Sequence, residues 1–168
     1  MQKILGLFLI VFTSYFVSGC ATTQYMKTGA GENIAIDRMV IDQDFKDDHL
    51  VKVALERDKS SNFYGAQATY MNDSAYAAFK ERKDFPKDSK ITLAFFGFSD
   101  KDGIVLPTEK MWSATMQKTL AKETGNWSYV SIDYNTMKPK FTDPVGVCYT
   151  GCHKVKEDND YVFIEHPR

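Results

Sequence analysis

The chain has 168 residues, of which 43% are hydrophobic and 26% are charged, and its formal net charge is −1. A chain of this length and composition can bury the core of one domain, which excludes a wholly disordered protein. Its 21 basic and 22 acidic residues leave no excess of positive charge, so no nucleic-acid-binding surface is expected. Aromatic residues make up 14% of the chain, which favours a β-rich core or a pocket for a flat ligand.

The N-terminus has the pattern of an export signal. Residues 4–17 form an apolar run that is too short to span a bilayer comfortably and has the length of a signal-peptide core. The run ends in Val17-Ser18-Gly19-Cys20, which resembles the lipobox of bacterial lipoproteins, where a cysteine after small residues is acylated. We therefore expect residues 1–19 to be a lipoprotein signal peptide and Cys20 to carry the lipid. An ordinary signal peptide with an incidental cysteine is the alternative.

A lipid on Cys20 would anchor the chain in the bacterial cell envelope, facing the periplasm. Residue 21 is alanine rather than aspartate, which by the common sorting rule favours the outer membrane. Residues 20–33 are small and polar, so we expect a flexible tether, followed by a folded domain over residues 34–168. The compartment would be oxidising, and paired thiols do not stay free there unless something occupies them.

Beyond the tether, strands and helices are expected to alternate irregularly, without a repeat. Apolar and alternating runs predict strands over residues 50–55, 63–71, 90–98 and 127–134. Helices are predicted over 75–83, after N-cap candidates at 72–74, and over 112–124, ended by Gly125. Residues 99–103 and 141–146 are predicted loops, whereas 34–40 and 161–164 fit either a short strand or helical structure. The pattern predicts an α+β fold, an antiparallel β-sheet with a few packing helices.

The motif that carries chemistry is Cys148-Tyr149-Thr150-Gly151-Cys152-His153. A Cys-x-x-Cys-His sequence attaches c-type haem, because both thiols bond to the haem vinyl groups and the histidine reaches the iron. Here the spacer has three residues instead of two, and Gly151 gives it the backbone freedom to bring both sulfurs to the vinyls. The motif favours one covalent haem c per chain, with Cys148 and Cys152 as anchors and His153 as the metal ligand.

Three other interpretations of this motif remain open at the level of the sequence. Cys148 and Cys152 could form a small disulfide, with His153 incidental to it. The same three residues could bind zinc, although a fourth ligand is not obvious nearby. The pattern could also have arisen by chance.

The residues around the motif resemble the C-terminal signature of the cytochrome P-460 and cytochrome c′-beta family. In that signature the haem motif is followed by a charged stretch and an Asp-Tyr/Met-Val-Phe element, which Asp160-Tyr161-Val162-Phe163 matches. Residues 124–129 resemble the family's tryptophan-containing strand, and residues 70–89 its middle section, so the resemblance covers about residues 45–166. It implies a β-rich α+β domain, usually a homodimer, whose haem iron is held by one histidine with the other face open.

The chain also departs from part of that family. Cytochrome P-460 enzymes oxidise hydroxylamine and carry a lysine cross-linked to the haem; the best-aligned position here is Ala94, or Leu93 with a shift of one residue, and neither can form the link. A pocket arginine of those enzymes falls near Gln67. The strand instead reads Ala94-Phe95-Phe96-Gly97-Phe98, and such an apolar, aromatic face resembles cytochrome c′-beta, whose open site favours a neutral diatomic such as nitric oxide.

Strand alternation decides which of these side chains can meet the haem together. It places Ala94, Phe96 and Phe98 on one face and Leu93 and Phe95 on the other. Either face could be the haem side, and the first, together with Gln67, is our candidate haem-contacting set. Tyr70 is a further candidate polar group of the pocket.

No residue stands out as a sixth iron ligand; the weak candidates are His49, His166, Met71, Met111, Met116 and Met137. The first hypothesis is therefore a lipid-anchored, periplasmic, mono-haem c-type cytochrome whose five-coordinate iron binds nitric oxide or a similar small ligand. A second hypothesis is an enzyme, a hydroxylamine or nitric oxide oxidoreductase of cytochrome P-460 type. A third is a haem-free lipoprotein binding module with a Cys148–Cys152 disulfide. The sequence does not indicate a redox partner.

Overall fold

The computed structural model describes residues 25–27, 32–35 and 47–164. The predicted signal peptide, the lipidation site Cys20 and the candidate ligand His166 lie outside these ranges. Within them, no helix is both long enough and apolar enough to cross a membrane.

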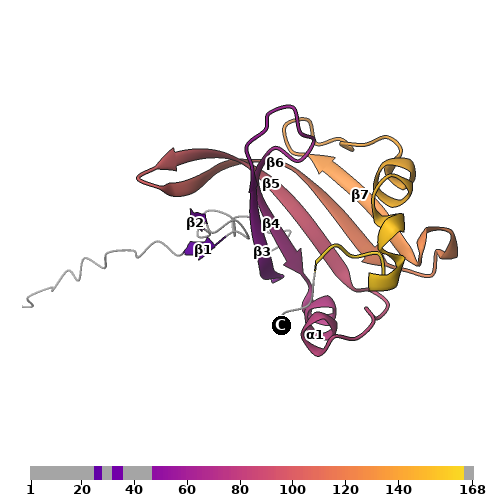
Figure 1. Ribbon diagram of the computed structural model, residues 1–168. Coiled ribbons are helices and arrows are strands. Elements are labelled where there is room, and N and C mark those ends of the chain that lie inside the picture. The colour runs from indigo at the N-terminus through magenta and orange to yellow at the C-terminus, as the bar shows by residue number, and fades with distance from the viewer. Residues whose placement is uncertain (1–24, 28–31, 36–46, 165–168) are drawn as a thin grey trace, which may run out of the picture.

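A seven-stranded sheet forms the body of the domain (Figure 1). Its strand order is β1-β2-β6-β5-β4-β3, and β7 also pairs with β6. All neighbouring strands are antiparallel except β2 and β6, which are parallel. The strands are β1 (Tyr25–Lys27), β2 (Asn33–Ala35), β3 (His49–Glu56), β4 (Gly65–Met71), β5 (Lys90–Lys101), β6 (Ile104–Lys118) and β7 (Trp127–Asp133). This mostly antiparallel sheet with a few short helices confirms the predicted α+β fold.

The helices are short and lie mainly at the ends of strands. Helix α1 (Asp73–Glu81) begins where predicted, because the Asn72 side chain accepts a hydrogen bond from the Ala75 N–H at 3.1 Å. A single turn, η2 (Lys122–Thr124), precedes β7. After β7 the chain forms η3 (Val145–Thr150) and η4 (His153–Asn159), the orange and yellow helices beside β7 in Figure 1.

The two faces of the sheet carry separate hydrophobic clusters, because successive strand residues point to opposite sides. One cluster includes Tyr70, Ala94 and Phe96. The other cluster contains residues of α1, β5, β6 and β7. It also contains the buried Val162 and Ile164 of the C-terminal segment, residues 145–164. The C-terminal segment is thereby held against the second face, which is the face that carries the site described below.

Four local predictions differ from the structure. The helix predicted over 112–124 is wrong, because these residues mostly belong to β6, which pairs with β5 on one side and β7 on the other. Only η2 is helical there, and Gly125 ends it with φ 64, as predicted. The loop predicted over 99–103 is reduced to a turn between β5 and β6. Strand β1 lies within the expected tether, and residues 161–164 form no regular element.

Candidate cofactor-binding site

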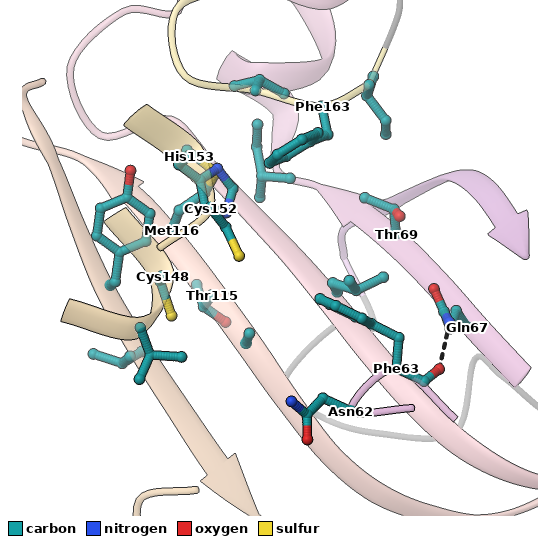
Figure 2. A pocket seen from close by; sticks show the side chains of 18 of the residues that line it. Asn62, Phe63, Gln67, Thr69, Thr115, Met116, Cys148, Cys152, His153 and Phe163 are labelled. Atoms are coloured by element: carbon teal, nitrogen blue, oxygen red, sulfur yellow. Dashed lines mark hydrogen bonds between the residues drawn. The ribbon is translucent and has the colours of Figure 1, made fainter. Parts of the chain in front are cut away.

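A cavity of about 540 Å³ lies between the sheet and the C-terminal segment (Figure 2). This volume falls within the roughly 300–1,000 Å³ that is typical of ligand and cofactor pockets. Side chains of the central strands form its floor, among them Thr69 of β4, Leu93 of β5 and Ala114 of β6. Residues 62–63 and the C-terminal segment complete the walls. The cavity therefore exists only because that segment is folded back over the sheet.

The two ends of this cavity differ in chemistry. Cys148, Cys152 and His153 lie at one end, and Asn62, Gln67 and Thr69 gather at the other (Figure 2). Lys52 lies opposite Thr69 in the register of β3 and β4, and it is the one lining residue in the described part of the chain with a permanent charge. Most of the remaining lining side chains are apolar. The cavity thus suits a ligand that is apolar over most of its surface and polar at one edge.

Both thiols of the motif line this cavity as free, half-buried cysteines. Burial raises the pKa of the Cys148 thiol, and the nearby Cys152 and Asp143 add to the shift. Cys148 is therefore held as a neutral thiol at neutral pH. In the described ranges no group of three histidine, cysteine or acidic side chains is arranged to hold a metal ion, so the zinc interpretation lacks a ligand set.

The three-residue spacer is accommodated by a π-helical turn. In η3 the Gly151 N–H donates to the Gly146 carbonyl, five residues earlier, at 2.9 Å. A π turn holds one residue more than an α turn, so the extra spacer residue is taken up within the helix. A Cβ at Gly151 would lie 2.8 Å from the Val147 carbonyl oxygen. Gly151 is thus needed for close backbone approach, and its φ of −77° is one that any residue adopts.

His153 is fixed in one orientation by the backbone. Its Nδ1 lies 2.6 Å from the carbonyl oxygen of Tyr161, and a carbonyl only accepts, so Nδ1 carries the proton. The ring also packs against the rings of Tyr129 and Phe163, each with centroids at 5.2 Å. Burial lowers the pKa of His153, although the bond to the Tyr161 carbonyl opposes this shift. The imidazole is therefore neutral at neutral pH, with the lone pair of Nε2 free to bind a metal.

Comparison with known families identifies the architecture that carries this site. Residues 42–164 match the family Cytochrome P460. The chain belongs to the cytochrome P460 family. A search of curated proteins finds no match to the chain. Membership of the cytochrome P460 family implies a haem cofactor and suggests a haem protein that acts on nitrogen oxides.

The residues of the cavity fit the haem that the cytochrome P460 family implies. Two free thiols and a neutral imidazole with an open Nε2 lie at one end of a single cavity. These are the groups that c-type haem attachment and axial ligation require. The largely apolar lining with one polar end also suits a macrocycle whose carboxylates lie along one edge.

The structure divides the remaining candidate haem contacts of this cytochrome P460 domain between two faces. Gln67 lines the cavity. Ala94, Phe96 and Phe98 do not: they belong to the hydrophobic cluster on the opposite face of the sheet, as does the fully buried Tyr70. The alternation is as predicted, but the face that meets the cavity is the one that carries Leu93. The choice of Ala94, Phe96 and Phe98 as cavity residues is therefore corrected.

Most of the candidate sixth ligands in the described ranges do not line this cavity. His49 instead binds Asp73 at 2.7 Å and stacks on Tyr76. Among the candidates in the described ranges, only Met116 is a lining residue, and it is buried beside His153 in Figure 2. Met71 lies in the cluster around α1, Met111 lies close to Gly65, and Met137 is exposed.

Several lining residues were not anticipated from the sequence. Lys52 lies on β3, which carries no motif. Its position on the cavity wall follows from the pairing of β3 with β4. Phe63 and Phe163 are about half-exposed aromatic side chains that line the cavity from its walls. Phe163 lies within the Asp-Tyr-Val-Phe element that follows the cysteine motif, and this element was the signal in the sequence that could have identified it.

Proposed function

We propose that this protein is a membrane-anchored, periplasmic, mono-haem c-type cytochrome whose five-coordinate iron binds nitric oxide or a similar small ligand. The observation that carries the proposal is the placement of Cys148, Cys152 and His153 on the wall of one haem-sized cavity. Cytochrome P460 membership supports the haem itself. The anchor is inferred from the lipobox-like residues that end in Cys20.

The chain supplies two attachment groups and one axial ligand. Cys148 and Cys152 would each hold the haem through a thioether, because addition of an S–H across a vinyl group places sulfur and hydrogen on its two carbons and needs no oxidant. His153 would offer Nε2 to the iron, because its Nδ1 proton is engaged by the Tyr161 carbonyl. When bound, the haem supplies an iron with one open coordination position for a diatomic ligand.

The side chains of the sheet floor determine which ligand such a site prefers. Leu93 and Ala114 are apolar, and one N–H of the Gln67 amide donates to the Phe63 carbonyl at 2.6 Å. A wall of this kind gives little hydrogen-bonding support to a ligand that becomes strongly charged, as bound dioxygen does. It therefore favours a neutral diatomic such as nitric oxide.

The test is an absorption spectrum, oxidised and reduced, of the full chain produced with haem-attachment machinery, together with its mass after denaturation. We expect a high-spin, five-coordinate c-type spectrum and a mass increased by one haem. Cys148→Ser combined with Cys152→Ser should release the haem in acid, whereas either single variant keeps it through one bond. Haem that survives acid extraction in the double variant would contradict the proposed attachment. A mass lower by two hydrogens, without haem, would support a Cys148–Cys152 disulfide instead.

A second candidate function is hydroxylamine oxidation of cytochrome P-460 type. The observation that favours it is Lys52, an amine on the cavity wall although neither Leu93 nor Ala94 supplies one. If Lys52 links to the haem, digestion of the denatured protein should yield a haem peptide that also contains residue 52. The spectrum would then show a red-shifted reduced Soret band, and the protein should turn over hydroxylamine with an electron acceptor. Lys52→Arg keeps the charge and removes the nucleophile. It should abolish the linked peptide, the red-shifted band and the turnover of hydroxylamine.

A further inference from the structure

The turn that follows η4 is held in a backbone conformation that its residues do not favour. Asp160 has φ 50 and Tyr161 has φ 65, so two successive non-glycine residues occupy the left-handed region. Such conformations are strained for residues with a side chain and persist only where surrounding contacts enforce them. The contacts at Asp160 therefore show which groups hold this turn in place.

Asp160 is bound from three separate parts of the fold. Its carboxylate forms an ion pair with Lys118, the last residue of β6, and both side chains are largely shielded, at 19% and 13% exposure. The same carboxylate accepts the Phe85 N–H at 3.3 Å. The buried Trp127 indole donates to the Asp160 backbone carbonyl at 2.9 Å. Asp160 thus pins the C-terminal segment to β6, to β7 and to the loop after α1.

The next residue in the turn makes the contact with the candidate iron ligand. The carbonyl oxygen of Tyr161 is the group that accepts the Nδ1 proton of His153 at 2.6 Å. The Tyr161 N–H donates to the Lys156 carbonyl at 2.7 Å, which ties the turn to the helix that begins at His153. The position of this carbonyl therefore depends directly on the turn that Asp160 holds.

We infer that Asp160, held by Lys118, is a positioning residue that sets the orientation and donor strength of His153 through the Tyr161 carbonyl. A hydrogen bond from the second ring nitrogen fixes the tautomer of a ligating histidine and increases its basicity toward the metal. Asp160 itself touches neither the cavity nor the ligand position. The inference rests on the proposed function in so far as it treats His153 as the iron ligand.

The test compares Asp160→Asn with Asp158→Asn in the full chain carrying haem. Both variants remove one negative charge, but Asp158 is exposed on η4, and its side chain makes no ion pair or hydrogen bond within the described part of the chain. The readouts are the fraction of covalent haem, the iron–histidine stretching band of the reduced protein and the affinity for carbon monoxide. We expect Asp160→Asn to keep covalent haem, lower the stretching frequency and change carbon monoxide affinity by about tenfold. Asp158→Asn should leave the stretching frequency and the carbon monoxide affinity unchanged. Asp160→Glu should restore both in part.

A purely structural role would give a different result. Asp160→Asn would then lower the unfolding midpoint without moving the stretching band, and that outcome would overturn the inference. If Asp160→Asn does not fold, Lys118→Gln removes the partner charge and is examined by the same band. If the wild-type chain carries no haem, the proposed function fails on its own. The inference is then decided by nitrogen NMR of His153 in the haem-free chain, where wild type should show the Nδ1–H tautomer and Asp160→Asn a mixture.

Discussion

Residues 93 and 94 are neighbours on β5, yet a lysine should have opposite consequences at the two positions. Leu93 is half-buried and lines the cavity. Ala94 is completely buried on the other face, where it lies opposite Ala68 of β4 in an apolar cluster. Leu93→Lys should therefore give a folded protein with an amine in the cavity, whereas Ala94→Lys should prevent folding or severely weaken it.

The difference between the two variants is large enough to measure. Full burial of a leucine contributes about 1.5–3 kcal/mol, so the half-buried Leu93 loses about 1 kcal/mol, and the lysine stem recovers part of this. At Ala94 the larger side chain costs about 1–3 kcal/mol in overpacking. Burying its unpaired charge adds several kcal/mol more. The total approaches the whole stability of a small domain, about 5–15 kcal/mol.

Urea unfolding followed by circular dichroism is the assay for this pair. We expect the Leu93→Lys chain to unfold cooperatively with a midpoint close to wild type, and the Ala94→Lys chain to lack a native baseline. The assignment of faces would be refuted if the two variants had equal stability, or if Ala94→Lys were the more stable. A mass spectrum of the denatured Leu93→Lys protein, loaded with haem, would also report whether an amine at this position becomes linked to the macrocycle.

Further expected outcomes concern the ligand set, the spacer and pH. Met116→Leu should leave the absorption spectrum unchanged, and conversion from a six- to a five-coordinate spectrum would instead identify Met116 as an iron ligand. Deletion of Thr150 should convert the π turn to an α turn and keep or raise the haem-loaded fraction, while one alanine inserted after Thr150 should lower it; the reverse order would contradict the role given to η3. Because burial lowers the pKa of His153, the unfolded haem-free chain binds its proton more readily. Stability should therefore fall as pH drops below about 6.5, by up to about 1.4 kcal/mol per pH unit. His153→Gln should remove that component from urea midpoints, and an unchanged slope would argue against it.

The secondary structure could be predicted where local signals and tertiary pairing agree. Asn72 caps α1 through a contact three residues away, and the alternation in β7 is visible in seven consecutive residues. The failure at β6 has a physical cause. Its residues 112–118 mix Trp, Ser, Ala, Thr and Met, which are compatible with helix or strand, and pairing with two neighbouring strands decides the outcome.

The candidate site could be predicted only where its residues are close together in the sequence. The residues Cys148, Cys152 and His153 form a contiguous motif, so a local pattern was enough to select them. Whether Leu93 or Ala94 faces the cavity depends on which face the C-terminal segment covers, and strand alternation does not contain that information. The link from Lys118 to Asp160 spans 42 residues, and no periodicity in the sequence marks it.

The order of the strands has a consequence for how the protein assembles. Strands β3 to β7 pair with their neighbours in the chain, apart from the addition of β2 at the edge of β6, so most of the sheet forms from successive hairpins. Pairings of short sequence separation form early and quickly. The segment that bears the thiols follows all of these strands in the chain and packs onto a sheet whose pairings do not include it. The floor of the cavity can therefore fold before its wall closes, which leaves both cysteines accessible to an attachment enzyme until the turn at Asp160 docks.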